Sequence, residues 1–463
     1  MGADGIQVQH SRTLAIIVPV AVLATIGALW IRHRIVSSAG FIVARAVKDP
    51  RFKNLDAQAA KLQADVQASP NSVQPRWKLA DMYQKLHLLD LARQQIEQIT
   101  RLSPGDATPA LALANVDLAL LHDNVAEQEF RAATRRWPGI VAGWQGLAAV
   151  LYREQHYTEC LEATGKALDL DPKSRSTRFI LASALLQYAR QFPSPEMYAP
   201  YARVARKELE DLLPTWPEPS EIHYRLGSAY SILRKTDKAI EHFSKAVQLR
   251  PRSPHFVVSL VDAYLAINKR DEAKRVLASA RAHNVQSPLL LDREGQIAQA
   301  TATPEGWNEA IRAFSEALRM DPDIEAFHEH LGSAYVRAGK LDLARQEFER
   351  AAILNPERPF PYQQLSAIYT RLGDSQRATA AAKMATRMVF NEQQLHHFEQ
   401  LSTAYPDDVK LHLVIADRYR DLKMISAARD KYRMVLRIDP GNEHAQREIA
   451  KLDSNRKATV TGG

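Results

Sequence analysis

At 463 residues, with 46% hydrophobic and 25% charged side chains, the chain is long for one compact core and too apolar to be disordered. Of its net charge of +8, residues 1–53 hold +5, from seven Lys and Arg against two Asp, which leaves +3 for the other 410 residues. A nucleic-acid binder concentrates basic charge on its binding domain, so we expect no nucleic-acid partner and a membrane surface beside residues 1–53.

The first expected element is a membrane-spanning helix at residues 14–31, which follows a short N-terminal segment at residues 1–13. Its sequence, LAIIVPVAVLATIGALWI, is uncharged, and eighteen residues at about 1.5 Å each span about 27 Å, close to the hydrocarbon thickness of a bilayer. A cleaved signal peptide has a shorter apolar stretch with its basic residues in front. Here only Arg12 precedes the stretch and the sequence RHR follows it. A signal peptide and a buried soluble helix remain the alternatives.

Residues 32–50 form a basic juxtamembrane segment. Positive charge flanks the cytoplasmic end of membrane helices, so the basic residues that follow Trp30 predict a single-pass protein with its C-terminal bulk in the cytoplasm. The lone cysteine, Cys160, excludes an intramolecular disulfide and favours a reducing compartment. The basic residues after Trp30 are Arg32, Arg34, Arg45, Lys48 and Arg51.

Prolines then recur at a fixed interval of 34 residues. A 34-residue period with helical patterning between the breaks predicts a solenoid of helix pairs. The prolines are Pro70, Pro104, Pro138 and Pro172, then Pro217 and Pro251, then Pro322 and Pro356.

The unit that ends at Pro356 shows the pattern most fully, with one apolar face on each of two predicted helices. Gly332 and Ala344 are small enough for the two helices to approach closely, and Phe348 fills the space beyond them. Gly339 separates the helices, and the proline ends the unit because it cannot continue a helix. The patterned positions are His328, Leu331, Gly332 and Tyr335 in the first helix and Ala344, Phe348 and Ala351 in the second.

This pattern resembles the tetratricopeptide repeat, which carries an aromatic residue, Leu-Gly and Tyr in its first helix and Ala, Phe, Ala and Pro downstream. The resemblance covers residues 73–442. It implies an all-α solenoid of about ten helix-turn-helix repeats, stacked as a right-handed superhelix, in addition to the one N-terminal transmembrane helix. It also implies protein partners on the concave face. The units are 73–106, 107–140, 141–174, 175–219, 220–253, 254–287, 291–324, 325–358, 359–392 and 409–442.

Two insertions interrupt the array, near residues 190–200 (QFPSPEMYAP) and at residues 393–408. Each must bulge from one face or lengthen a helix. At the ends, residues 51–72 read as a half-repeat or cap, residues 443–453 as a capping helix, and residues 454–463 as a disordered tail.

No motif for catalysis, cofactor binding or metal binding is found. The sequence HEH at residues 328–330 lacks the spacing of a zinc protease, because histidines two apart do not share a helix face. His396 and His397, in a segment predicted to be irregular, have no obvious third ligand, and Cys160 lies where the repeat holds a small residue. We therefore expect no enzyme, no cofactor, no metal and no small-molecule substrate.

The sequence thus predicts a membrane-anchored scaffold that binds protein partners in the assembly, stabilisation or recruitment of a membrane complex. One alternative is a permanent accessory subunit of such a complex. The other is an enzyme of unrecognised type that uses the inserted segments.

Overall fold

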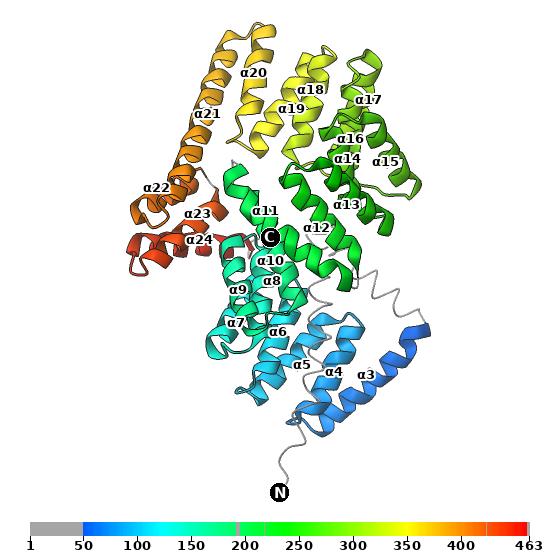
Figure 1. Cartoon of the computed structure of the whole chain (residues 1–463), viewed down its shortest axis with the longest axis vertical. Coiled ribbons are helices and arrows are strands. Elements are labelled where there is room, and N and C mark those ends of the chain that lie inside the picture. The colour runs from blue at the N-terminus through cyan, green and yellow to red at the C-terminus, as the bar shows by residue number, and fades with distance from the viewer. Residues whose placement is uncertain (1–49, 191–194, 217, 423, 461–463) are drawn as a thin grey trace. The chain divides into compact units, whose positions relative to one another are not determined.

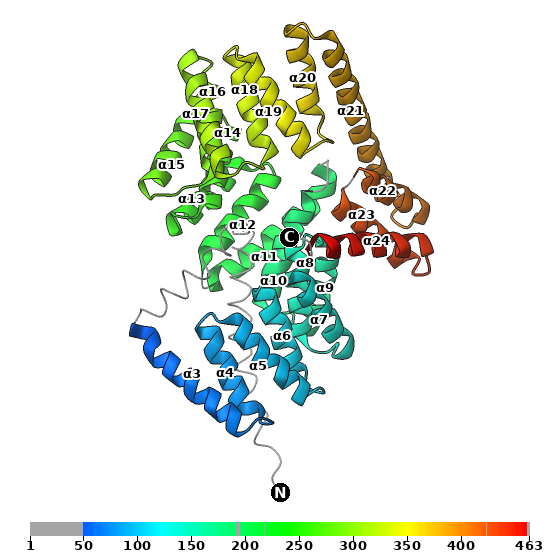
Figure 2. The same ribbon diagram turned by 180° about the vertical axis from the view of Figure 1, so that it is seen from behind.

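The structure is a computed structural model (Figure 1 and Figure 2). It describes residues 50–190, 195–216, 218–422 and 424–460. Within these residues it holds 22 α-helices, one short 3-10 helix and no strand, which confirms the all-α prediction for this part of the chain. The chain forms two compact units, Met1–Leu249 and Arg250–Gly463.

In the first unit a single helix, α3, is followed by antiparallel helix pairs that contact one another in chain order. The helices are α3 (Pro50–Ala68), α4 (Val73–Lys85), α5 (Leu89–Leu102), α6 (Ala107–Ala119), α7 (Asp123–Arg136), α8 (Val141–Arg153), α9 (Tyr157–Leu170), α10 (Arg175–Ala189), α11 (Pro195–Leu212), η2 (Leu213–Thr215), α12 (Pro219–Ile232) and α13 (Thr236–Leu249).

The second unit continues the same arrangement and ends on a single helix, α24. Its helices are α14 (Pro254–Ala266), α15 (Arg270–Ala282), α16 (Pro288–Gln299), α17 (Pro304–Met320), α18 (Glu325–Arg337), α19 (Leu341–Leu354), α20 (Pro359–Arg371), α21 (Ser375–Ala404), α22 (Val409–Asp421), α23 (Ile425–Ile438) and α24 (Glu443–Val460).

The predicted membrane anchor is not among the described residues. The N-terminal segment at 1–13, the membrane helix at 14–31 and nearly all of the juxtamembrane segment at 32–50 lie outside them. Among the helices that are described, none has both the length and the apolar character needed to cross a membrane. The anchor therefore stays a prediction.

The repeat count is larger than the ten predicted. Ten complete pairs run from α4 to α23, and α3 and α24 add the equivalent of one further pair. The unit predicted to begin at residue 291 also begins earlier, since α16 starts at Pro288. The cause is α17, which has 17 residues where α19 has 14, so a unit of 34 residues that ends at residue 324 begins three residues after Pro288.

Both insertions are partly helical. Part of the first forms the start of α11, at Pro195. The second insertion lengthens a helix: α21 is a single helix of 30 residues that ends at Ala404. The prediction that His396 lies in an irregular segment is therefore wrong. The disordered tail was predicted to start at residue 454, which is too early, because α24 continues to Val460.

Three glycines in first helices each make room for a phenylalanine ring of the second helix in the same pair. A Cβ atom placed on Gly227 would lie 2.5 Å from Phe243, and one on Gly332 would lie 2.9 Å from Phe348. A Cβ atom on Gly295 of α16 would likewise be too close to the ring of Phe314 on α17. These contacts are too short for a side chain, so the glycines set the distance between the paired helices.

We expect Gly227→Leu to destabilise the α12–α13 pair by about 1–3 kcal/mol, because a packed interior does not accept extra side-chain volume. Gly165→Leu is the matched control, since Gly165 is also helical but has no atom within 4 Å of its Cβ position. The control should keep or slightly raise the thermal midpoint, as leucine forms helices better than glycine. Equal midpoints for the two variants would contradict the close contact.

A repeated hydrogen bond joins first helices to the second helix before them. In three places a tyrosine hydroxyl donates to the glutamate 20 positions earlier, and on α3 and α4 Gln63 donates to Tyr83 at 2.5 Å over the same interval. The last turns of α21 and the single helix α3 thus pack as second helices. The tyrosine pairs are Tyr230 with Glu210 (2.7 Å), Tyr369 with Glu349 (2.6 Å) and Tyr419 with Glu399 (2.6 Å).

Candidate functional site: the face of the first helices

First helices of neighbouring pairs contact one another within each unit. In the first unit α6 contacts α8, α8 contacts α10, and α10 contacts α12; in the second, α14 contacts α16 and α16 contacts α18. Second helices of neighbouring pairs make fewer contacts. A stack whose first helices lie closer together curves around them, so these helices line the inner side of each unit's curve. We call this surface the inner face.

On the inner face of the second unit, ion pairs connect three successive first helices. Asp292 of α16 is almost fully buried and accepts hydrogen bonds from Arg293 (2.6 Å), Gln296 (2.7 Å) and His330 of α18 (2.6 Å). Arg293 also donates to Asp262 of α14 at 2.5 Å. The five side chains, which we call the Asp292 ladder, are therefore held in one arrangement before any partner arrives.

A second inner-face ion pair extends this pattern toward α20. The guanidinium of Arg358, just before α20, lies 2.7 Å from the carboxylate of Glu329 on α18. Burial raises the pKa of Glu329, while the positive charges of Arg358 and His330 oppose that rise. The pair fixes α18 to the start of the next helix pair.

Buried side chains occupy one part of the inner face of the first unit, between α8 and α12. Arg225 of α12 is buried and pairs with Glu221 at 3.1 Å. Burial opposes the charged guanidinium, but Tyr152 of α8 and Glu221 raise the pKa of Arg225 above its ordinary value. Arg225 and Tyr152 thus link α12 to α8 across two repeats.

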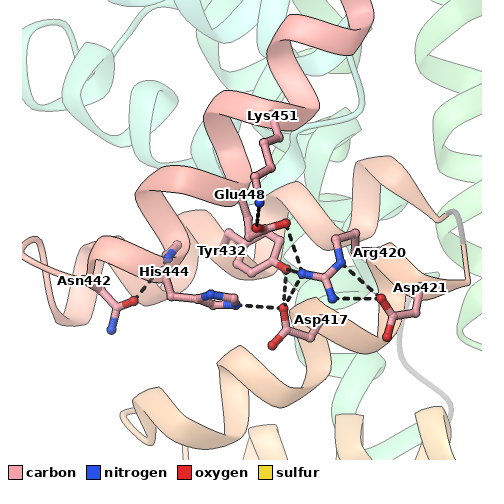
Figure 3. Close-up of polar contacts among 9 residues, drawn as sticks. Asp417, Arg420, Asp421, Tyr432, Asn442, His444, Glu448 and Lys451 are labelled. Carbon is pink, nitrogen blue, oxygen red and sulfur yellow. Dashed lines mark hydrogen bonds and ion pairs between the residues drawn. The ribbon is translucent and has the colours of Figure 1, made fainter.

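The last three helices are joined by a polar cluster (Figure 3). A carboxylate oxygen of Asp417 on α22 accepts hydrogen bonds from Tyr432 of α23 (2.6 Å), His444 of α24 (2.8 Å) and Arg420 (2.9 Å). Arg420 also donates to Glu448 of α24 at 3.0 Å. The polar groups of the cluster satisfy one another's hydrogen-bonding capacity, so the cluster holds α24 against the last helix pair.

The pKa values in this cluster follow from the same contacts. Burial favours the neutral carboxyl of Asp417, but hydrogen bonds from Tyr432 and His444 outweigh it and lower the pKa of Asp417. Burial and the bond to Asp417 together raise the pKa of Tyr432. Asp417 is therefore ionised and Tyr432 is neutral near pH 7.

The histidines of the HEH sequence do not form one site. His328 faces the carboxylate of Glu347 on α19 at 2.6 Å and the carbonyl oxygen of Pro322 at 3.1 Å. His330 instead donates to Asp292 at 2.6 Å. Residues two apart on a helix point to different sides, and each ring here links its helix to a different neighbour.

The other residues that the sequence singled out have structural surroundings. His396 and His397 lie on the continuous helix α21, where Gln400 donates to the ring of His396 at 2.9 Å. Cys160 is buried, and its Sγ donates to the carbonyl oxygen of Ala148 at 3.3 Å. Burial raises the pKa of the Cys160 thiol, which disfavours the reactive thiolate.

One group of possible metal ligands was missed in the sequence analysis. Glu127 of α7 and Glu154 and His156 of the turn before α9 have ligand atoms within 4.8 Å of one another. Arg131 already pairs with Glu127 at 2.8 Å and also with Glu159. This arginine supplies positive charge beside the carboxylates, so the group reads as an ion-pair network between α7 and α9. A glutamate two residues before a histidine in a turn is the only local signal.

Glu129 of α7 is expected to make the stability of the first unit depend on pH. Burial, and then the negative charge of Asp117, raise its pKa from 4.5 to about 7. A carboxyl whose pKa is raised by folding stabilises the folded state below its unfolded pKa and loses that contribution as pH rises through about 7. We therefore expect a higher thermal midpoint at pH 6 than at pH 8, and a smaller difference in Glu129→Gln. Glu162→Gln, at an exposed glutamate, should behave as wild type; an unchanged difference in Glu129→Gln would contradict the assignment.

Two segments match family models of the tetratricopeptide repeat, residues 220–253 and residues 305–359. The chain carries tetratricopeptide repeats. The first match has the bounds of one predicted unit, and the second covers α17 to α19, so the resemblance seen in the residue pattern is confirmed there. The other described helix pairs repeat the same arrangement of two helices.

Curated proteins are similar to this chain over part of their length. The Saccharomyces cerevisiae protein "Anaphase-promoting complex subunit CDC16" is 28% identical over 178 residues, which cover 38% of this chain and 20% of that protein. The human "Protein O-mannosyl-transferase TMTC1" is 22% identical over 211 residues, 46% of this chain and 19% of that protein. The chain thus spans about a fifth of these relatives. Among solved structures, a tetratricopeptide repeat protein from Parabacteroides merdae is 13% identical with a TM-score of 0.45, covering 57% of this chain and 98% of that one.

Proposed function

We propose that the chain is a membrane-anchored tetratricopeptide scaffold that binds protein partners on the inner face of its second unit. The Asp292 ladder is the observation that carries this proposal. Its charged side chains are held in place by ion pairs, yet the side chains of Asp262 and His330 remain 44% and 34% exposed. Ordered polar groups lose little entropy on binding, which favours recognition of a polar partner segment.

The first unit supports this choice by contrast. Arg225 on its inner face is buried, whereas the ladder of the second unit leaves hydrogen-bonding groups within reach of solvent. The role we propose for the binding is assembly, stabilisation or recruitment of a membrane complex, because an anchor raises the effective concentration of membrane-bound partners.

Crosslinking of the full chain in native membranes, followed by capture, tests the proposal. The double variant Asp262→Asn with His330→Gln alters exposed groups of the inner face and roughly keeps their size. The asparagine oxygen can still accept one of the two hydrogen bonds from Arg293, and the glutamine amide can still donate to Asp292. The matched control is Glu305→Gln with Glu309→Gln, which alters exposed residues of the second helix α17. We expect the inner-face variant alone to lose its crosslinked partner. Equal recovery from both variants would place binding elsewhere.

The proposed location is a single-pass membrane protein with the array in the cytoplasm, which rests on the basic residues after Trp30. A protease added outside intact cells or spheroplasts should leave the array uncut, and detergent lysis should expose it. Digestion before lysis would reverse the topology and move the candidate partners to the other side of the membrane.

The crosslinking experiment also distinguishes the scaffold from the first of two alternatives. A permanent accessory subunit should yield one stoichiometric partner, and a scaffold several substoichiometric ones. An enzyme that uses the inserted segments is the other alternative. The similarity to a transferase, which covers 19% of that protein, points to no catalytic residue in this chain. We propose no cofactor and no small-molecule substrate.

A further inference from the structure

Two histidine rings meet between α12 and α13. His223 of α12 and His242 of α13 place their Nδ1 atoms 3.0 Å apart, with ring centroids 5.2 Å apart and ring planes inclined by 37°. When no ion or molecule is bound between them, one ring donates its N–H to the lone pair of the other. The two lone-pair positions therefore converge on the same small volume.

The surrounding contacts hold both rings on rigid elements. Gly227 lies one turn after His223, and its close contact with Phe243 sets the separation of the helices beside the pair. Tyr230 stacks on the ring of His242, with centroids 5.4 Å apart and planes at 18°. A ligand site built on packed helices keeps its geometry better than one on a loop.

The same two positions are paired in other helix pairs, always 19 residues apart. Arg76 donates to Gln95 at 3.1 Å, and His328 lies 2.6 Å from Glu347. These pairs link the two helices of a repeat, and such a link is the structural role that His223 and His242 could also fill. The histidine pair differs from these two because both of its members present a ring nitrogen, the commonest protein ligand for transition metals.

We propose that His223 and His242 form a two-imidazole binding site for a divalent transition metal ion such as Ni²⁺ or Zn²⁺. At a metal–nitrogen distance of about 2.0–2.1 Å, two ligands at a right angle lie about 2.9 Å apart and two at the tetrahedral angle about 3.4 Å apart. The observed 3.0 Å lies between these values. Water or a partner's side chain completes the coordination.

The charge state of the pair suits this role. Burial lowers the pKa of both histidines, and the neighbouring His242 and Lys245 lower the pKa of His223 further. Neutral rings keep the lone pairs that a metal needs. The nearby charges are mixed: Lys245 pairs with Glu241 at 2.7 Å, and His242 is near Lys238 and Glu210. Two carboxylates thus accompany the two ammonium groups around the site.

Equilibrium dialysis of the full chain in detergent micelles against Ni²⁺ tests the site. The chain has 15 histidines, so the difference between variants is the decisive quantity. We expect His223→Gln and His242→Gln each to bind one Ni²⁺ ion per chain fewer than wild type. His328→Gln removes a histidine from the same position of another repeat and should bind as much as wild type.

Thermal unfolding gives the second readout. Ni²⁺ should raise the midpoint of wild type and of His328→Gln but not that of the two pair variants, and Mg²⁺, which prefers oxygen ligands, should raise none. Circular dichroism without metal checks that the variants remain folded. Equal Ni²⁺ stoichiometry in wild type and the pair variants, or no Ni²⁺ binding by wild type, would overturn the proposal.

Discussion

Replacing Asp292 with alanine is expected to destabilise the middle of the second unit by about 3 kcal/mol. The Asp292 side chain is 1% exposed and accepts hydrogen bonds from Arg293, Gln296 and His330. Each hydrogen bond to a charged group contributes about 1.5–3 kcal/mol, and donors left without an acceptor lose it. The loss stays below the sum because Arg293 keeps Asp262 and His330 reaches water.

Native-state hydrogen exchange of α16 and α18 measures this effect, since repeat arrays do not unfold in one step. At about 1.4 kcal/mol per tenfold change, amides of these helices should exchange on the order of 10²-fold faster. Asp262→Ala is the matched control. This substitution removes the more exposed partner of Arg293, while Arg293 keeps its ion pair with Asp292. The loss of stability should therefore be about 0–1 kcal/mol. Similar exchange rates in the two variants would show that burial of Asp292 contributes nothing.

Deleting residues 1–34 is expected to release the chain from membranes while the helix pairs stay folded. The deleted segment contains the predicted anchor, and the described repeats bury their cores against one another. The truncated protein should appear in the soluble fraction with an unchanged helical circular dichroism spectrum. A truncated protein that is insoluble or unfolded would show that the array depends on the deleted segment.

Substituting the charges alone separates the anchor from surface electrostatics. Arg32→Gln with Arg34→Gln keeps the apolar stretch, so this variant should remain in the membrane fraction. If the truncated chain stays bound at low salt and is released by high salt, residues 35–53 hold it electrostatically, because surface charges are screened within about 8–10 Å at physiological ionic strength. Retention after a high-salt wash would point to a bound partner.

Most of the fold could be predicted from the local periodicity of the sequence. Proline spacing and small residues at helical intervals are properties of neighbouring residues, so they predicted helix pairs over residues 73–442. The prediction that Gly332 permits a close approach is also local, and the structure places it against Phe348. Counting by a fixed period failed at Pro288, because one extra turn in α17 shifts the count without changing the pattern.

The turns within pairs show a second limit of sequence reasoning. Gly339 and Gly373 adopt positive φ there, as glycine favours, but His87, Leu121 and Gln155 adopt the same left-handed conformation. Their neighbouring helices impose it at some cost in strain. A non-glycine residue in such a turn leaves no signal in the sequence.

The sequence by itself determined that the chain is a series of helix pairs with an apolar, basic-flanked N-terminal segment, because both features depend on residues close together in the chain. Only the tertiary structure decided which charges meet. His330 and Asp292 are 38 residues apart, and His223 and His242 are 19 apart. Their contacts depend on how far each helix is rotated about its axis and how closely it packs on its neighbours, which is set by side-chain volume across the whole interface.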